Sequence, residues 1–120
     1  MLSLSPATRI YVVTGVTDMR KSFNGLTAIV SNHLVQDPLS GHMFVFCNRR
    51  RDRIKVLYWD RSGLWVCAKR LEKGTFAWPS ETAVSVEMTT EELTMLIGGI
   101  DLRNTRRRRW MRDVHAQRSS

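Results

Sequence analysis

Apolar residues occur along the chain in short runs that turn-forming residues separate. The first run, Arg9–Gly15, is β-branched and apolar and stops at a glycine, a pattern typical of a buried strand. The next apolar positions recur at the spacing of one helical face, and they are Met19, Phe23, Leu26, Val30 and Leu34. We therefore expect a helix that has Thr17 or Asp18 as its N-cap and ends at the turn Asp37–Gly41.

Five further runs with strand character lie between residues 42 and 88, each separated from the next by a few turn residues. They are His42–Cys47, Arg53–Asp60, Leu64–Lys69, Gly74–Trp78 and Ala83–Met88. Short strands at this spacing are typical of an antiparallel meander. The pattern thus predicts an antiparallel sheet against which the apolar face of the first helix packs.

A second helix is predicted near the end of this apolar region. Thr89 is followed three residues later by Glu92, which is the pattern of a capping box, and Gly98-Gly99 is expected to loosen or end the helix. Its apolar positions form one face, and they are Leu93, Leu96, Ile97 and Ile100. The acidic residues in this segment have a structural explanation, since negative charge favours the N-terminus of a helix.

The apolar periodicity ends after Leu102, and the residues beyond it are rich in arginine. A chain of 120 residues is long enough for one hydrophobic core and short for two. We expect residues 1–103 to form a single α+β domain, mainly an antiparallel β-meander with two helices packed on it. Residues 104–120 are expected to form a basic, mobile tail, because their like charges repel one another.

Charge is distributed along the chain in blocks. The formal net charge is +8 and the pI is about 10.5. Residues 43–79 carry nine Lys or Arg against three Asp or Glu, whereas residues 80–101 carry five acidic and no basic residues. Such a basic protein favours a nucleic acid, an anionic membrane or an acidic protein as partner, and a small-molecule substrate is not expected.

The first residues lack the features of a secretory signal, and no run reaches the roughly 18 apolar residues of a membrane span. A cytoplasmic protein without membrane contact is therefore expected. Cys47 and Cys67 lie in apolar strand-like runs, where a reducing compartment favours buried thiols over a disulfide.

The segment 49–70 combines eight Lys or Arg residues with three large aromatic residues in a predicted β-hairpin. Its turn, Arg61-Ser62-Gly63, fits a three-residue loop with glycine in the left-handed region. Trp59 then faces Trp65, and one side of the hairpin displays a set of cations and rings: Arg53, Lys55, Trp59, Trp65 and Lys69. The other side is apolar and suits the core; it consists of Ile54, Val56, Tyr58, Val66 and Ala68.

A surface with cations and aromatic rings suits a nucleic acid, because Lys and Arg neutralise phosphates and flat rings stack on exposed bases. Three consecutive arginines, Arg49, Arg50 and Arg51, stand at the preceding turn and are expected to be exposed. Two alternatives remain open. The rings could line a second small core beneath solvated lysines, or a two-residue Ser62-Gly63 turn could shift the register by one and separate the shared face.

The tail holds a second cluster with anion-binding character, which consists of Arg106, Arg107, Arg108, Arg109 and Trp110. A flexible arginine-rich segment can follow a phosphate chain without a matched surface, and the planar guanidinium grips phosphate at two points. The same composition would also serve as a solubility tail or dock on an acidic protein.

Catalytic and cofactor sites have no recognisable pattern in this sequence. The three histidines and two cysteines are scattered without metal-ligand spacing, and no glycine-rich phosphate loop is present. A magnesium nuclease would need a carboxylate cluster, but the available carboxylates occupy cap, turn or strand-end positions that explain them. These carboxylates are Asp18, Asp52, Asp60 and Glu72. We therefore expect no catalytic residue, no metal and no cofactor.

Three segments of the chain match a known protein family in order and in sequence: Gly15–Leu26, Asp37–Pro79 and Thr89–Arg103. On these segments the chain resembles the TnpB accessory protein of the IS-sixty-six family of bacterial insertion sequences. The resemblance implies a non-catalytic protein that is required alongside a separate transposase, which carries its own acidic catalytic residues. It weakens after Arg103, so the tail is interpreted from its charge alone.

Together, the charge pattern and the resemblance predict an accessory factor of DNA transposition that binds DNA through the hairpin and the tail. The transposase of the same element is the second expected partner. The alternative is a protein-interaction adaptor that docks on the transposase without reading DNA itself, either through Glu91 and Glu92 or through the aromatic face.

Overall fold

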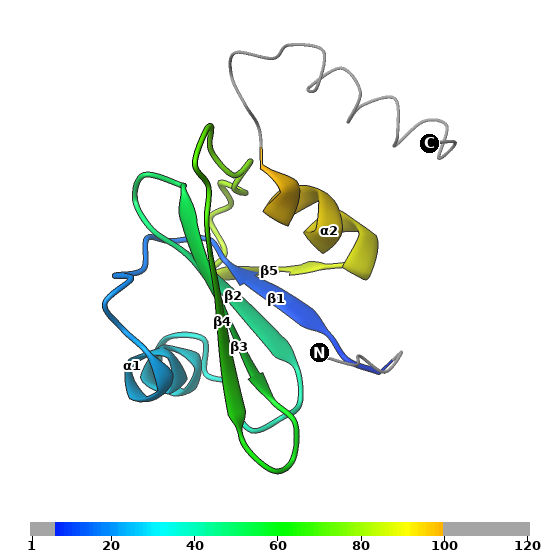
Figure 1. The fold of residues 1–120 in the computed structure, drawn as a ribbon. Helices are drawn as coiled ribbons and strands as arrows, with labels where there is room; N and C mark the ends of the chain where they lie inside the picture. Colours follow the sequence, from blue (N-terminus) through cyan, green and yellow to red (C-terminus); the bar gives the residue numbers. More distant parts are fainter. Residues whose placement is uncertain (1–6, 100–120) are drawn as a thin grey trace.

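The computed structural model describes residues 7–99, in which one five-stranded sheet carries helical segments on both faces (Figure 1). The strands are β1 (Ile10–Val13), β2 (Met43–Cys47), β3 (Arg53–Trp59), β4 (Leu64–Arg70) and β5 (Ser85–Met88). The helical segments are α1 (Phe23–Ala28), which continues as the π-helical turn η1 (Ile29–His33), and α2 (Thr90–Gly98). This arrangement confirms the α+β fold. The boundary at residue 103 stays a prediction, because residues 100–120 lie outside the described part.

The strand order is β4-β3-β2-β1-β5, so only part of the sheet is a meander. Strands β2, β3 and β4 are antiparallel neighbours, as expected. Strand β1 is parallel to β2, because the connection between them includes α1 and carries the chain back to the starting end of the sheet. Strand β5 pairs with β1 and not with β4, which corrects the simple meander.

The segment Gly74–Trp78 does not form the predicted strand. Its apolar residues instead fill the core from a loop. Phe76 is buried with Cys47 and Ile54, and the indole N–H of Trp78 donates to the carbonyl of Val13 over 2.8 Å. Burial of these two rings as a loop therefore replaced the strand that their β-propensity predicted.

Each face of the sheet has its own core, because successive side chains of a strand point to opposite faces. The face under α1 and η1 buries Val13, Leu26, Val30, Leu34, Phe44, Phe46 and Leu57. The face under α2 buries Ile10, Val12, Met43, Val45, Leu93 and Leu96. Strand β2 lies between the two cores and is buried at all five positions.

The first helix begins later than predicted. Its N-cap is Ser22, without a side-chain cap bond, and neither Thr17 nor Asp18 has that role. Thr17 is buried, and its backbone N–H donates to the carbonyl of Cys47 over 2.8 Å, which holds the segment as a loop beside the end of β2. Phe23 consequently stands at the first helical position with 45% of its surface exposed, so the prediction that it belongs to the buried apolar face was wrong.

The second helix agrees closely with expectation. The Thr89 hydroxyl accepts from the backbone N–H of Glu92, and the Glu92 carboxylate accepts from that of Thr89, so the capping box is confirmed. The helix ends at Gly99, which has φ +77° and lies so close to Leu71 that an added Cβ would come within 2.7 Å of Leu71 Cδ1. Ile100, predicted for the buried face, lies outside the described residues.

Candidate nucleic-acid interface

The turn between β2 and β3 is organised by the side chain of Asn48. Its Oδ1 accepts from the backbone N–H groups of Asp52 and Arg53 at 3.1 and 3.0 Å, and its amide donates to Asp52 Oδ1 over 2.7 Å. An asparagine that bonds to backbone groups a few residues ahead is a common means of closing a turn. The arginines 49–51 are therefore held at the tip of a closed turn.

Only two of the three tip arginines are exposed. Arg51 has a left-handed φ of +59° and is half-buried, and its guanidinium donates to the carbonyls of Thr14 and Asn48 at 3.4 Å. It also lies 5.7 Å from the ring centre of Trp78, a cation–π distance. The expectation that Arg51 is exposed was wrong, because the left-handed backbone turns this side chain back onto the loop that covers the core.

The β3–β4 hairpin has a register that differs by one residue from the prediction. Trp59 faces Leu64 and Tyr58 faces Trp65, whereas the predicted three-residue loop placed Trp59 opposite Trp65. The Asp60 carboxylate accepts from the N–H groups of Ser62 and Gly63 at 2.9 Å. Backbone N–H of Asp60 donates to the carbonyl of Gly63, so these two residues face each other and no G1 bulge forms.

Asp60 is therefore the residue that determines the register. Its Oδ2 also accepts from the indole N–H of Trp65 over 2.7 Å. This bond, together with those from the N–H and hydroxyl of Ser62, lowers the pKa of the Asp60 carboxyl to about 2. The left-handed conformation that we expected at Gly63 occurs at Arg61 instead, with φ +86°.

Because of the shift in register, the residues predicted to form one cationic-aromatic face lie on opposite sides of the sheet. Trp65 and Lys69 lie on the side of the sheet that α2 covers, opposite to Arg53, Lys55 and Trp59. Lys69 Nζ donates to the carbonyl of Ile97 in the last turn of α2 over 2.8 Å, where a cation also complements the helix dipole. The prediction of one shared face was therefore wrong, and Lys69 has a structural partner in the second helix.

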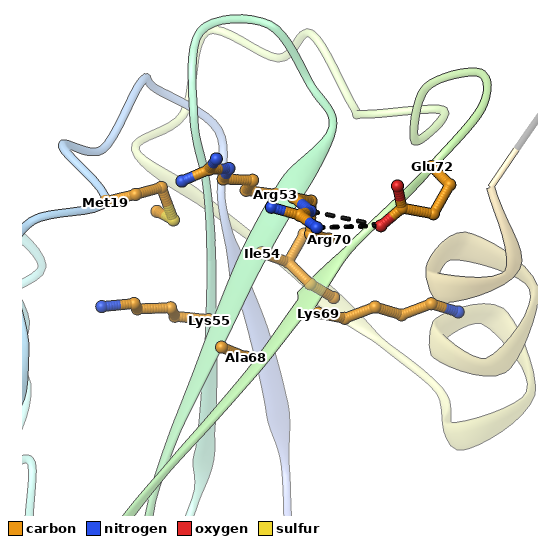
Figure 2. A pocket seen from close by; sticks show the side chains of 8 residues that line it. All are labelled: Met19, Arg53, Ile54, Lys55, Ala68, Lys69, Arg70 and Glu72. Atoms are coloured by element: carbon orange, nitrogen blue, oxygen red, sulfur yellow. Dashed lines mark hydrogen bonds and ion pairs between the residues drawn. The ribbon is translucent and has the colours of Figure 1, made fainter.

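The true register assembles a different group of cations on the α1 side. Arg53 directly faces Arg70, and Lys55 faces the small residue Ala68. Figure 2 shows the side chains of Arg53 and Lys55 extending toward the side on which Met19 lies, whereas Lys69 points the opposite way. These residues border an open hollow of about 390 Å³, lined by Met19, Arg53, Ile54, Lys55, Ala68, Lys69, Arg70 and Glu72. Arg70 was not among the predicted site residues, because the register decides on which side of the sheet its side chain lies.

A second hollow of about 340 Å³ adjoins the first, and both include Met19 and Arg53. Arg49 and Arg50 line the second hollow from the tip of the β2–β3 turn. We call the surface formed by the two hollows the basic groove. Lys69 also lines the first hollow, but its ammonium group is bound to α2, so we define the groove by the other five cations, Arg49, Arg50, Arg53, Lys55 and Arg70.

The cations of the groove differ in how their charges are satisfied. Lys55 Nζ donates to the carbonyl of Lys21 over 2.8 Å, which ties β3 to the loop before α1. Arg70 forms an exposed ion pair with Glu72 at 3.2 Å. Within residues 7–99 the guanidinium of Arg53 has no hydrogen bond or ion pair, although Arg70 stands directly opposite. Two like charges at facing positions repel, and Glu72 offsets only the charge of Arg70, so Arg53 is the member of the pair that lacks an anion in the described part of the chain.

The carboxylates near the groove already have local partners. Asp18 binds the guanidinium of Arg20 at 2.7 Å and the Arg20 backbone N–H, and these bonds lower the pKa of Asp18 to about 2. Asp52 accepts from the amide of Asn48. The two hollows are lined by three carboxylates, those of Asp18, Asp52 and Glu72, and by six Lys or Arg side chains, so the groove presents net positive charge.

The other predicted site residues have separate locations. Glu91 and Glu92 lie in the first turn of α2, where Glu92 completes the capping box. Trp59 is half-buried at the far end of β3. Arg106, Arg107, Arg108, Arg109 and Trp110 lie outside the described residues.

The described residues also bear on metal ligands, membrane-spanning helices and thiols. Within residues 7–99 no cluster of His, Cys, Asp and Glu side chains could hold a metal ion. No helix in that range is long and apolar enough to cross a membrane. Cys47 and Cys67 are both unpaired thiols, and burial raises the pKa of Cys47.

Comparison with known proteins identifies one matching family and two similar proteins. The sequence model of the family described as "IS66 Orf2 like protein" matches residues 8–107. Two proteins of Sinorhizobium fredii (strain NBRC 101917 / NGR234) are similar over nearly their whole length. "Uncharacterized protein y4jC" is 38% identical over 108 residues, which cover 90% of this chain and 92% of that protein. "Uncharacterized protein y4hO" is 36% identical over 104 residues, with 87% and 90% covered. No solved structure matches.

Proposed function

The chain belongs to the family of IS66 Orf2-like proteins, which have an accessory role in transposition, and on this premise we propose that it binds DNA through the basic groove. The observation that carries the proposal is the register of β3 and β4, which places Arg53 opposite Arg70 beside the tip arginines. In this proposal the protein itself is non-catalytic.

Phosphate is the chemical group that best fits the groove. Four of its five cations are arginines, whose planar guanidinium groups bind phosphate oxygens in pairs. A phosphate in the groove would give the guanidinium of Arg53 the anion that Glu72 already provides for Arg70. If each of the five cations neutralised one phosphate of a duplex, log K would fall with log salt with a slope of about −4.5.

The arginine cluster at residues 106–109 is proposed to add to this binding. The support for this part is the sequence alone, since four consecutive arginines with Trp110 can follow a phosphate chain. The tail would steepen the salt dependence without contributing base specificity, because phosphate contacts position a protein on DNA but carry no sequence information.

The test is a fluorescence-anisotropy titration of the full chain with a labelled 20-base-pair duplex at several salt concentrations. We expect Arg53→Gln to weaken binding equally for unrelated sequences and to reduce the salt slope by about 1. Arg61→Gln is the matched control, because Arg61 is an exposed arginine at the opposite end of β3. Equal losses in the two variants would show that the groove is not the site, and no binding by the wild-type chain would overturn the proposal.

Docking on the transposase is the second candidate function. The observation that favours it is Trp65, which is 48% exposed on β4, the edge strand, and on the side away from the basic groove. Exposed tryptophans are frequent at the centres of protein interfaces. Glu91 in the first turn of α2 remains a proposed contact together with Glu92.

A pull-down with the transposase of the same element tests this candidate. Trp65→Ala and Glu91→Lys should each weaken capture while DNA affinity stays unchanged. Glu91→Lys is preferred to Glu92→Lys, because Glu92 also supports the capping box and its loss would destabilise α2. Undiminished capture by both variants would exclude these contacts.

A further inference from the structure

The basic groove has the properties of a site for a duplex and lacks those of a site for a single strand. We propose that it binds double-stranded DNA in preference to single-stranded DNA, an inference that rests on the proposed function. Proteins that bind single strands combine cations with aromatic side chains on which the bases stack. The positions of the described tryptophans therefore bear on this question, as does that of Phe23, which is 45% exposed but lines neither hollow.

Two of these tryptophans are directed away from the groove and have structural partners. Trp65 lies on the opposite side of the sheet from Arg53, and its indole N–H is bound to Asp60. The indole N–H of Trp78 is bound to Val13, and the guanidinium of Arg51 lies over its ring. Neither ring is available to a base that follows the groove.

Trp59 lies on the same side of the sheet as Arg53 and Lys55, but α1 covers the strand between Trp59 and these two cations. Leu57, the residue midway between Lys55 and Trp59 on that side, is completely buried in the core beneath α1. At about 3.3 Å per residue, Trp59 lies about 13 Å along the strand from Lys55. A nucleotide bound at Lys55 would therefore have to pass over the helix to reach the ring.

The side chains that line the two hollows include no aromatic residue among those described. Without stacking, a flexible single strand would lose conformational freedom on binding and gain only its phosphate contacts. A duplex is already rigid and carries one charge per about 1.7 Å of its axis, so its charge density is twice that of one of its strands alone.

The groove is also preorganised. Bonds of Asn48 close the turn that carries Arg49 and Arg50, and Lys55 is held by the carbonyl of Lys21. The backbone that carries the cations is thus held on two adjacent strands and one closed turn, which reduces the freedom that is lost when the groove binds a rigid array of phosphates.

The experiment compares a 20-base-pair duplex with a single strand of the same length by fluorescence anisotropy at one salt concentration. It uses the full chain with Trp110→Ala, because Trp110 lies outside the described residues and would offer a ring of its own. We expect the duplex to bind at least tenfold more tightly. Trp65→Leu, added to this background, should change neither affinity by more than twofold.

The double variant Arg53→Gln with Arg70→Gln tests whether the preference for duplex DNA arises in the basic groove. This pair should weaken duplex binding by tenfold or more and bring the two affinities closer together. Equal or tighter binding of the single strand in the Trp110→Ala chain would overturn the inference and leave the proposed function standing. If the chain bound neither the duplex nor the single strand, both the inference and the proposed function would be overturned.

Discussion

The side chain of Asn48 offers the sharpest test of how the groove is built. Replacement by alanine removes four hydrogen bonds: two that it accepts from the backbone N–H groups of Asp52 and Arg53, a long one that it accepts from the Cys47 thiol at 3.9 Å, and one that it donates to Asp52. Each such bond contributes about 0.5–1.5 kcal/mol net. Asn48 is half-buried, so water reaches part of the vacated site and the loss falls toward the lower end of the summed range. We expect Asn48→Ala to lower the free energy of unfolding by about 2 kcal/mol.

The assay is urea unfolding followed by circular dichroism, with a thermal melt as a second measurement. A loss of that size corresponds to a fall in Tm of about 8–16 °C for a domain of this length. Asn32→Ala is the matched control, because Asn32 is exposed in η1 and its side chain has no hydrogen bond within residues 7–99. The control should stay within about 0.5 kcal/mol of wild type. If Asn48→Ala were as stable as the control, the turn would not depend on this side chain.

Three further predictions concern the hairpin and the second helix. The pKa of Asp60 is lowered to about 2, mainly by the indole N–H of Trp65. The ionised carboxylate therefore contributes stability that is present above pH 4 and is lost as the pH falls through 2. An NMR titration of the carboxyl with a midpoint near 4 would contradict this prediction. Gly99→Ala should destabilise the fold by about 1–3 kcal/mol in urea unfolding, because φ is +77° and the new Cβ would meet Leu71. Lys69→Met should lower stability by about 0.5–1 kcal/mol, since the last turn of α2 loses a cation, and should leave the affinity for duplex DNA unchanged in anisotropy titrations.

Two of these predictions, those for Gly99 and Lys69, have a control in the same chain. Gly15→Ala should be nearly neutral, because a Cβ at Gly15 would meet no atom within 4 Å and its φ is not positive. For Lys69, the contrast is Arg70→Gln, which should weaken duplex binding although the residue is adjacent in sequence. A Lys69→Met chain that lost affinity as strongly as Arg70→Gln would show that both residues contact DNA.

Local sequence signals identified the elements whose stabilising contacts lie close together in the chain. The capping box of α2 depends on Thr89 and Glu92, three residues apart, and the strands β1 to β4 depend on runs of apolar and β-branched residues. The tip arginines and the charged residues of β3 were likewise recognisable, because each lies beside its own turn signal. These parts of the fold and of the candidate site follow from interactions over a few residues.

The composition of the groove depended on contacts that no local pattern encodes. Side chains alternate with a period of two, so the one-residue shift that Asp60 produces moved Trp65 and Lys69 to the other face and brought Arg70 opposite Arg53. The start of α1 and the inward position of Arg51 depend in the same way on partners distant in sequence, Cys47 and Thr14. Local chemistry specified most of the segments that are strands and helices, and long-range packing decided that Gly74–Trp78 is a loop and which charges share a surface.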